Sequence, residues 1–196
     1  MKSFPIQAVP VTEENVQEFF EFSKNNFDYG KPQDEKIDEL HRLLKKGALL
    51  YLVKNKSGEI VGTFVLRKVT SPIRFFGVPI DVRNTFHLFK VNISKKYSHQ
   101  SNKSLAGGRF LTATLAFAER IAKQHGAKKL LVGIDPKNPN WNTRKMGLFK
   151  SPHGYKTNIL LTLKRAVDHH YERFKTKITG KPQKNPRKIT YLTKKL

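Results

Sequence analysis

A strand–helix–strand pattern in the middle of the chain constrains the fold more than any other feature of the sequence. Thr85–Ile93 alternates apolar residues with others, as strands in a sheet do, and Leu130–Ile134 is a short apolar run typical of a buried strand. Between them, Gly107 and Gly108 open an amphipathic helix that stops at Gly126. A βαβ unit of this kind places its two strands parallel in one sheet, so the pattern predicts an α/β fold with a mixed central sheet.

The residues before this unit predict an antiparallel part of the same sheet, together with two helices. Ile6–Val11 is expected to be a short strand, and Ala48–Val53 and Ile60–Leu66 flank turn residues in the manner of a β-hairpin. Two amphipathic helices precede the hairpin. The first starts at Thr12 and the second ends at Gly47.

Four further elements are less regular. Ser71–Asn84 is expected to contain a second hairpin, and Tyr155–Leu163 is apolar enough to predict a strand. In the basic tail, a helix is expected over Val167–Phe174. A strand over Ile189–Thr193 is expected to lie beside the Tyr155–Leu163 strand, with a basic loop, Lys175–Lys188, before it.

The order of these elements resembles the GNAT superfamily of N-acetyltransferases over residues 5–163. Lys103-Ser-Leu-Ala-Gly-Gly108 is similar to the family's pyrophosphate loop, Gln/Arg-x-x-Gly-x-Gly/Ala, with Lys replacing Gln/Arg and Ala replacing the first Gly. Independently, glycines at a helix start let backbone N–H groups approach an anion. The resemblance implies a GNAT-like domain over residues 1–165, with a mixed sheet flanked by helices, a basic extension over residues 166–196, and an acyl-CoA cofactor, most simply acetyl-CoA. The cofactor-binding residues that it implies are Val91, Ile93, Lys103, Ala106, Gly107, Gly108, Arg109 and Asn142.

The same resemblance implies that His87 is the catalytic base. It stands six residues before Ile93, where histone-modifying members carry a carboxylate on the central strand. A histidine, with an ordinary pKa of about 6.5, can accept a proton at neutral pH, and a histidine hydrogen-bonded within the core is the alternative. Phe149 stands where the family has a tyrosine that protonates the departing thiolate. Either no protein acid is used, or Tyr97 or His153 is the substitute acid, or acyl transfer has been lost.

The formal net charge of +23 is carried by the last two thirds of the chain. Residues 1–60 hold ten acids and nine Lys and Arg, whereas residues 61–196 hold five acids and 29 Lys and Arg. A nucleic acid is the natural partner for such a surface, and a solvated basic face is the alternative. Trp141 either stacks on a base or packs over apolar surface. In the tail, we expect a basic flap beside the acceptor cleft that holds a phosphate backbone. Its residues are Arg173, Lys175, Lys177, Lys181, Lys184, Arg187 and Lys188. A disordered basic end is the alternative.

The absence of cysteine excludes disulfides, thiolate nucleophiles and zinc–thiolate sites. Adjacent His169 and His170 point in different directions on a helix, so no metal site is expected. No apolar run approaches the length of a membrane span, and we expect a soluble, cytoplasmic protein. The sequence therefore predicts an acetyl-CoA-dependent N-acyltransferase whose acceptor is an amine of nucleic acid or of a nucleic-acid-associated molecule. The alternatives are an acceptor that is a protein lysine, a protein N-terminus or a small amine, and an inactive GNAT scaffold that binds nucleic acid.

Overall fold

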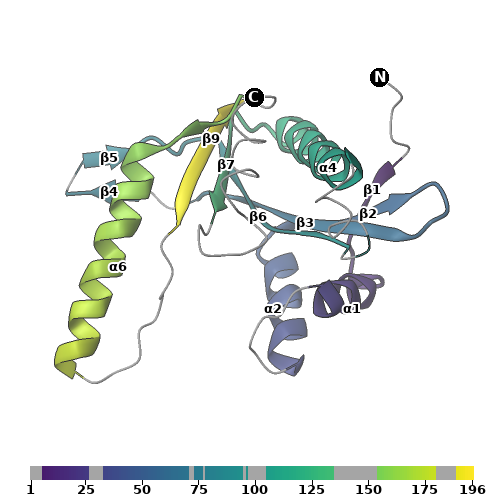
Figure 1. Cartoon of the computed structure of the whole chain (residues 1–196), viewed down its shortest axis with the longest axis horizontal. Helices are drawn as coiled ribbons and strands as arrows, with labels where there is room; N and C mark the ends of the chain where they lie inside the picture. The colour runs from purple at the N-terminus through teal and green to yellow at the C-terminus, as the bar shows by residue number, and fades with distance from the viewer. Residues whose placement is uncertain are drawn as a thin grey trace. The chain divides into compact units, whose positions relative to one another are not determined.

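The computed structural model of the chain divides into two compact units (Figure 1). The first comprises residues 1–68 and 88–126, and the second comprises residues 69–87 and 127–196. The residues that the structure describes are 6–26, 33–70, 73–76, 78–94, 96, 105–134, 154–179 and 189–196.

The first unit contains the elements predicted from the N-terminal part of the sequence and from the central helix. They are β1 (Ile6–Pro10), α1 (Val16–Asn26), α2 (Gln33–Lys45), β2 (Leu49–Asn55), β3 (Ile60–Lys68), most of β6 (Thr85–Ile93) and α4 (Leu105–Gln124). Strand β2 pairs antiparallel with both β1 and β3, with Pro10 opposite Tyr51 and Leu52 opposite Thr63. Both the N-terminal strand and the hairpin are confirmed.

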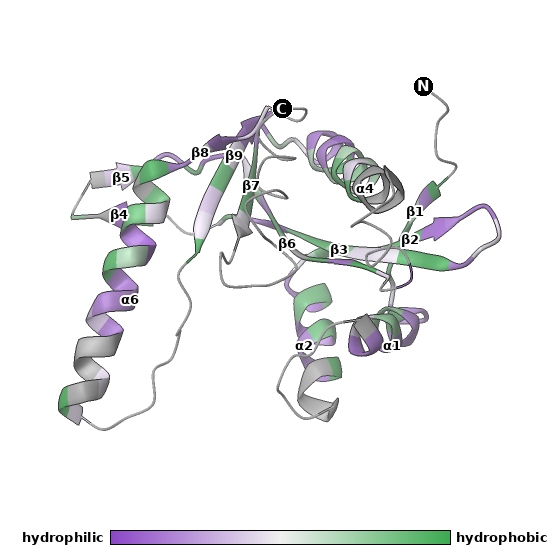
Figure 2. Cartoon of the chain, viewed as in Figure 1, coloured by the Kyte–Doolittle hydropathy of each residue, from purple (hydrophilic) through white to green (hydrophobic). Residues whose placement is uncertain are grey.

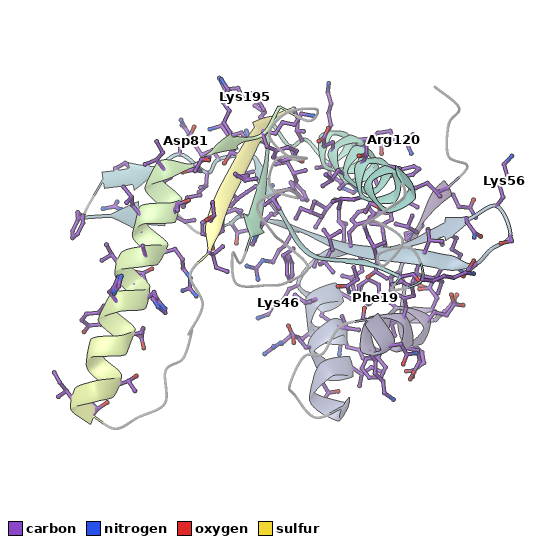
Figure 3. All side chains as sticks on the ribbon, viewed as in Figure 1. Phe19, Lys46, Lys56, Asp81, Arg120 and Lys195 are labelled. Carbon is purple, nitrogen blue, oxygen red and sulfur yellow. The ribbon has the colours of Figure 1, made fainter. Side chains whose placement is uncertain are left out.

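Helices α1 and α2 cover one face of the β1–β2–β3 sheet and α4 lies on the other face (Figure 1). Phe19 of α1 points into the core, as Figure 3 shows, where it packs with Leu50, Leu52 and Val65 of the sheet. These side chains are completely buried or nearly so. Removing an apolar side chain of this size from water stabilises the fold by about 1.5–3 kcal/mol, so this core holds the first unit together.

The second unit contains the predicted hairpin and the C-terminal elements. They are β4 (Ile73–Phe75), β5 (Val78–Ile80), β7 (Lys129–Ile134), β8 (Lys156–Thr157), α6 (Ile159–Thr179) and β9 (Thr190–Lys195). Strand β9 lies between β7 and β8 and is antiparallel to both. The prediction of a terminal strand that joins the sheet beside the previous strand is therefore confirmed.

The prediction of a strand over Tyr155–Leu163 was wrong. Only Lys156–Thr157 is strand, and α6 begins at Ile159. The Asn158 side chain caps this helix, because its Oδ1 accepts a hydrogen bond from the backbone N–H of Leu161 at 3.1 Å. The helix then runs without a break to Thr179. It therefore includes the predicted helix Val167–Phe174 and the first residues of the predicted basic loop Lys175–Lys188. It also runs across residue 165, after which the basic extension was expected to begin.

Apolar and charged residues alternate along the coloured part of α6 in Figure 2. Ile159, Leu163, Val167 and Tyr171 follow one another at intervals of four residues and are exposed. Charged residues stand between them in the sequence, and Lys164 and Asp168 form an ion pair at 2.7 Å along the helix. Among the helices of the described residues, none has an apolar run long enough to cross a bilayer.

Candidate active site

Three cross-strand pairs of β7 and β9 lie in rows on one face of the second unit's sheet. They are Lys129 with Lys195, Leu131 with Thr193, and Gly133 with Tyr191. Residues directly opposite each other on neighbouring strands share a face, and so do residues two apart along a strand. Successive rows are about 6.6 Å apart, because a strand rises about 3.3 Å per residue. The basic row therefore lies about 13 Å from the row that contains Tyr191.

His87 of β6 lies beside Tyr191 of β9 at one end of these rows. Their ring centroids are 6.2 Å apart and the ring planes are inclined at 60°. Gly133 provides the space between them. A Cβ atom at Gly133 would lie 3.3 Å from Cε1 of Tyr191 and 3.5 Å from Nε2 of His87. The sequence predicted a functional His87, whereas the tyrosine beside it was not anticipated.

The backbone of Tyr191 is held on both sides by the start of α6. Its N–H donates a hydrogen bond to Oγ1 of Thr162 at 3.0 Å, and its carbonyl accepts one from the N–H of Asn158 at 2.8 Å. Burial raises the pKa of the Tyr191 hydroxyl above its ordinary value, and the positive charges of Arg165 and Lys164 oppose that shift. The hydroxyl is therefore protonated at neutral pH and can donate a proton.

The end of β6 carries the residues expected to line the acyl-CoA site in the first unit. Val91 and Ile93 are half-buried, and Asn92 between them is buried. The Asn92 amide nitrogen donates to Oγ of Ser23 at 3.3 Å and to Oγ1 of Thr63 at 3.2 Å. Buried amides need such partners, because an unpaired polar group in a core is costly. These bonds fix the part of β6 that carries Val91 and Ile93.

The α4 start was expected at Gly107 and Gly108, but the helix begins two residues earlier, at Leu105. Ala106, Gly107, Gly108 and Arg109 therefore belong to its first turns. The first N–H groups of a helix have no acceptor within the helix and lie at the positive end of its dipole. The first turn of α4 carries no acidic residue that would compete for them. This arrangement fits an anion such as the pyrophosphate of an acyl-CoA.

Several predicted site residues lie outside the part of the chain that the structure describes, and their roles stay predictions. They are Tyr97, Lys103, Trp141, Asn142, Lys181, Lys184, Arg187 and Lys188. Arg173, Lys175 and Lys177 belong to α6, so their backbone is helical and does not form a loop. Within the described ranges, no three His, Cys, Asp or Glu side chains gather where they could hold a metal ion. His169 is buried and His170 is exposed, although their ring centroids are 5.7 Å apart.

No protein-family model and no curated protein matches the sequence. Solved structures, by contrast, match nearly the whole chain. The GNAT domain of an S. lividans protein is 12% identical, covers 97% of this chain and 90% of its own, and superimposes with a TM-score of 0.58. A spermidine/spermine N-acetyltransferase from Vibrio cholerae is 10% identical, covers 97% of this chain and 92% of its own, and has a TM-score of 0.57. A Salmonella typhimurium protein is assigned as an acetyltransferase and was solved with its cofactor acetyl-CoA. It is 12% identical, covers 97% of this chain and 94% of its own, and has a TM-score of 0.53.

These likenesses, together with the order of helices and strands, show that the chain has the GNAT acetyltransferase fold. The predicted fold is thereby confirmed. Since a fold hosts many functions, the activity must be argued from the site itself.

Proposed function

We propose that this protein is an acetyl-CoA-dependent N-acyltransferase whose acceptor is an amine of nucleic acid or of a nucleic-acid-associated molecule. The observation that carries the proposal is the His87–Tyr191 pair, a potential base beside a protonated hydroxyl on one sheet face of a GNAT fold. The acetyl-CoA complex of the Salmonella neighbour supports the choice of cofactor.

Bound acetyl-CoA supplies an activated acyl group as a thioester, and the start of α4 is suited to hold its pyrophosphate. The imidazole of His87 accepts a proton from the acceptor nitrogen as that nitrogen forms the new amide bond to the acyl carbon and the carbon–sulfur bond breaks. The Tyr191 hydroxyl is the candidate donor of a proton to the leaving sulfur, the role for which the sequence offered only Tyr97 or His153. His87 then releases its proton to solvent and Tyr191 regains one from solvent, so that the net change is the transfer of one proton from nitrogen to sulfur.

The distribution of positive charge supports this acceptor class. The second unit, which contains His87 and Tyr191, carries 20 Lys and Arg and four Asp and Glu, an excess of 16 out of the chain's net 23. A field of that sign attracts polyanions and repels polyamines. A cationic acceptor, such as the one named for the Vibrio cholerae neighbour, is therefore disfavoured here.

Transfer of label from acetyl-CoA to separate pools of DNA, tRNA and protein tests the proposal. We expect label in a nucleic-acid pool, and we expect it to be lost in a His87→Gln variant that still binds CoA. Label confined to protein would replace the acceptor with a lysine or an N-terminus. Absence of CoA binding together with retained nucleic-acid binding would show an inactive scaffold.

A further inference from the structure

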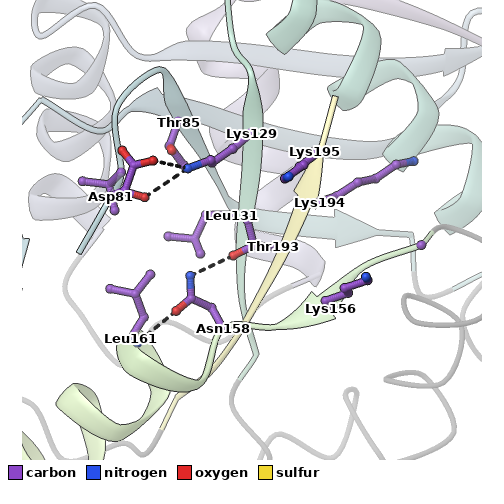
Figure 4. Close-up of a pocket in the computed structure, with 12 residues that line it drawn as sticks. Asp81, Thr85, Lys129, Leu131, Lys156, Asn158, Leu161, Thr193, Lys194 and Lys195 are labelled. Carbon is purple, nitrogen blue, oxygen red and sulfur yellow. Dashed lines mark hydrogen bonds and ion pairs between the residues drawn. The ribbon is translucent and has the colours of Figure 1, made fainter.

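A pocket of about 470 Å³ opens in the second unit at the basic end of the β7–β9 rows (Figure 4). Its volume is in the range of sites that hold small molecules or single building blocks of polymers. It lies on the same sheet face as Tyr191, because Lys129, Leu131, Thr193 and Lys195 line it and belong to the rows described above. The candidate catalytic pair and this pocket therefore share one surface.

The rim of the pocket is positively charged. Lys156 stands opposite Thr193 in the β8–β9 pairing, and Lys195 stands opposite Lys129. Lys129 is committed to Asp81, whose Oδ2 lies 2.6 Å from its Nζ. Lys156 and Lys195 are exposed and form no ion pair with any carboxylate of the described residues. Two ammonium groups are thus available to an anion at the mouth.

Asp81, the only acidic side chain among the described residues that line the pocket, does not cancel this charge. Asp81 accepts hydrogen bonds from Lys129 at 2.6 Å and from Nε of Arg83 at 3.1 Å. These two cations hold the pKa of the Asp81 carboxyl far below its ordinary value, so it stays ionised and stays engaged with them. An incoming anion therefore meets Lys156 and Lys195 without a competing carboxylate.

The floor of the pocket is apolar. Val82, Leu131 and Leu161 line it and are buried together with Ile80 in one hydrophobic cluster. Asn158 stands at the side, and its amide is already used to cap α6 and to bond Oγ1 of Thr193 at 3.2 Å. A ligand that matches the whole pocket needs an anionic end for the lysines and a flat or apolar body for the floor.

We propose that this pocket binds a nucleotide unit, with its phosphate against Lys156 and Lys195 and its base over Val82, Leu131 and Leu161. Phosphates recruit lysine, and every base has an apolar face that packs on such a floor. The assignment of this nucleotide to the acceptor nucleic acid rests on the proposed function. The two lysines stand one and two rows, about 7 and 13 Å, from the Tyr191 row, which leaves a neighbouring part of the acceptor to reach His87.

Two measurements test the pocket directly. In the first, a nucleoside monophosphate is titrated into the protein while the methyl resonances of Leu131 and Leu161 are followed by NMR. In the second, fluorescence anisotropy measures the affinity for a labelled single-stranded oligonucleotide over a range of salt concentrations. The variants are K156E/K195E, the charge-retaining K156R/K195R, and K56E/K123E as a matched control with the same charge change at exposed lysines of the first unit.

We expect the monophosphate to shift both leucine methyl resonances. We expect K156E/K195E to weaken oligonucleotide binding at least about tenfold and to lower the salt slope by one to two units, since each lost phosphate contact removes about one unit. K156R/K195R and K56E/K123E should bind nearly as the unaltered protein does. The proposal would be overturned if K156E/K195E kept its affinity for the oligonucleotide, or if the monophosphate left the methyl resonances of Leu131 and Leu161 unchanged.

The same measurements distinguish an acceptor nucleic acid from a free nucleotide and from CoA as the ligand of the pocket. Binding of the monophosphate but not of the oligonucleotide would overturn the acceptor assignment and leave a free-nucleotide site. Displacement of the monophosphate by CoA would assign the pocket to the cofactor and also overturn the proposal. Nucleotide binding in the pocket without any acyl transfer would support the pocket while contradicting the proposed function, so the two failures are distinguishable.

Discussion

The imidazole of His87 lies edge-on to the ring of Tyr191, with centroids 6.2 Å apart, although the two residues belong to strands from distant parts of the chain. One ring can accept a proton, and the other carries a hydroxyl that keeps its proton at neutral pH. Their proximity turns two unremarkable residues into a potential acid–base pair.

His87→Gln should lower kcat/KM for acyl transfer by about 100-fold or more, the usual cost of removing a general base. The rate of the unaltered enzyme should fall at acidic pH, where a histidine is protonated, and the variant should lose that limb of the pH–rate profile. His170→Gln, an exposed histidine on α6, is the matched control. An unchanged rate in His87→Gln would make His87 a structural residue of the sheet.

Tyr191→Phe keeps the buried ring and removes only the hydroxyl, so the fold should persist while kcat falls by about 100-fold. Because burial raises the pKa of Tyr191, the rate should fall only above the ordinary tyrosine value of about 10. The free energy of unfolding should also fall at high pH. Because the pKa of Tyr191 is raised in the folded state, this stability is intact below about pH 10 and is lost as the pH rises further. Tyr191→Phe should lose less stability over that pH range, because it has no hydroxyl to ionise at this position. Tyr171→Phe, which removes an exposed hydroxyl from α6, should leave kcat unchanged.

Gly133→Ala should reduce activity more than it reduces stability. The new methyl group would lie 3.2 Å from Cγ2 of Ile189 and 3.3 Å from Cε1 of Tyr191, which is close enough to displace the tyrosine ring by a few tenths of an ångström. Overpacking of this kind costs about 1–3 kcal/mol. Thermal unfolding and kcat measured on the same preparation check this, and full activity in the alanine variant would show that the ring spacing is not used.

Gly108→Leu should abolish CoA binding in a folded protein. The position is helical, since α4 begins at Leu105, and leucine favours a helix by about 0.5–1 kcal/mol over glycine. The added side chain stands among the N–H groups that are suited to the pyrophosphate. Calorimetric titration with CoA measures the effect, with Ala116→Leu at an exposed position of α4 as the control. Equal affinity in the two variants would remove the pyrophosphate site from the start of α4.

Asp81→Asn should destabilise the protein at neutral pH and destabilise it progressively less as the pH falls. Hydrogen bonds from Lys129 and Arg83 lower the pKa of Asp81, so the folded state favours the carboxylate. A depressed folded-state pKa gives stability that is present above the ordinary aspartate value, about 4, and is lost as the pH falls below it. The difference in Tm between the two proteins should therefore shrink from pH 7 to pH 3.

Local sequence determined most of the elements because their patterns are unambiguous. The hairpin of β2 and β3 follows from two apolar runs around Asn55–Gly58, and α4 follows from its helical periodicity and the stop at Gly126. The run from Ile159 to Leu163 fits a strand and a helix equally well, since five apolar or β-branched residues satisfy both periods. In the structure, the Asn158 side chain caps a helix at this point. This cap is a local signal in the sequence, but the prediction gave more weight to the apolar run.

The sequence by itself determined the order of strands and helices, the concentration of positive charge in the last two thirds of the chain, and His87 as a candidate base. It could not place Tyr191 beside His87, because nothing local records which strands become neighbours. That proximity depends on β9 entering the sheet next to β7, so that Tyr191 pairs with Gly133, whose missing side chain leaves room for both rings. The lysine-rimmed pocket has the same origin. Lys129, Lys156 and Lys195 come from three separate strands, and only the register of those strands brings their charges to one surface.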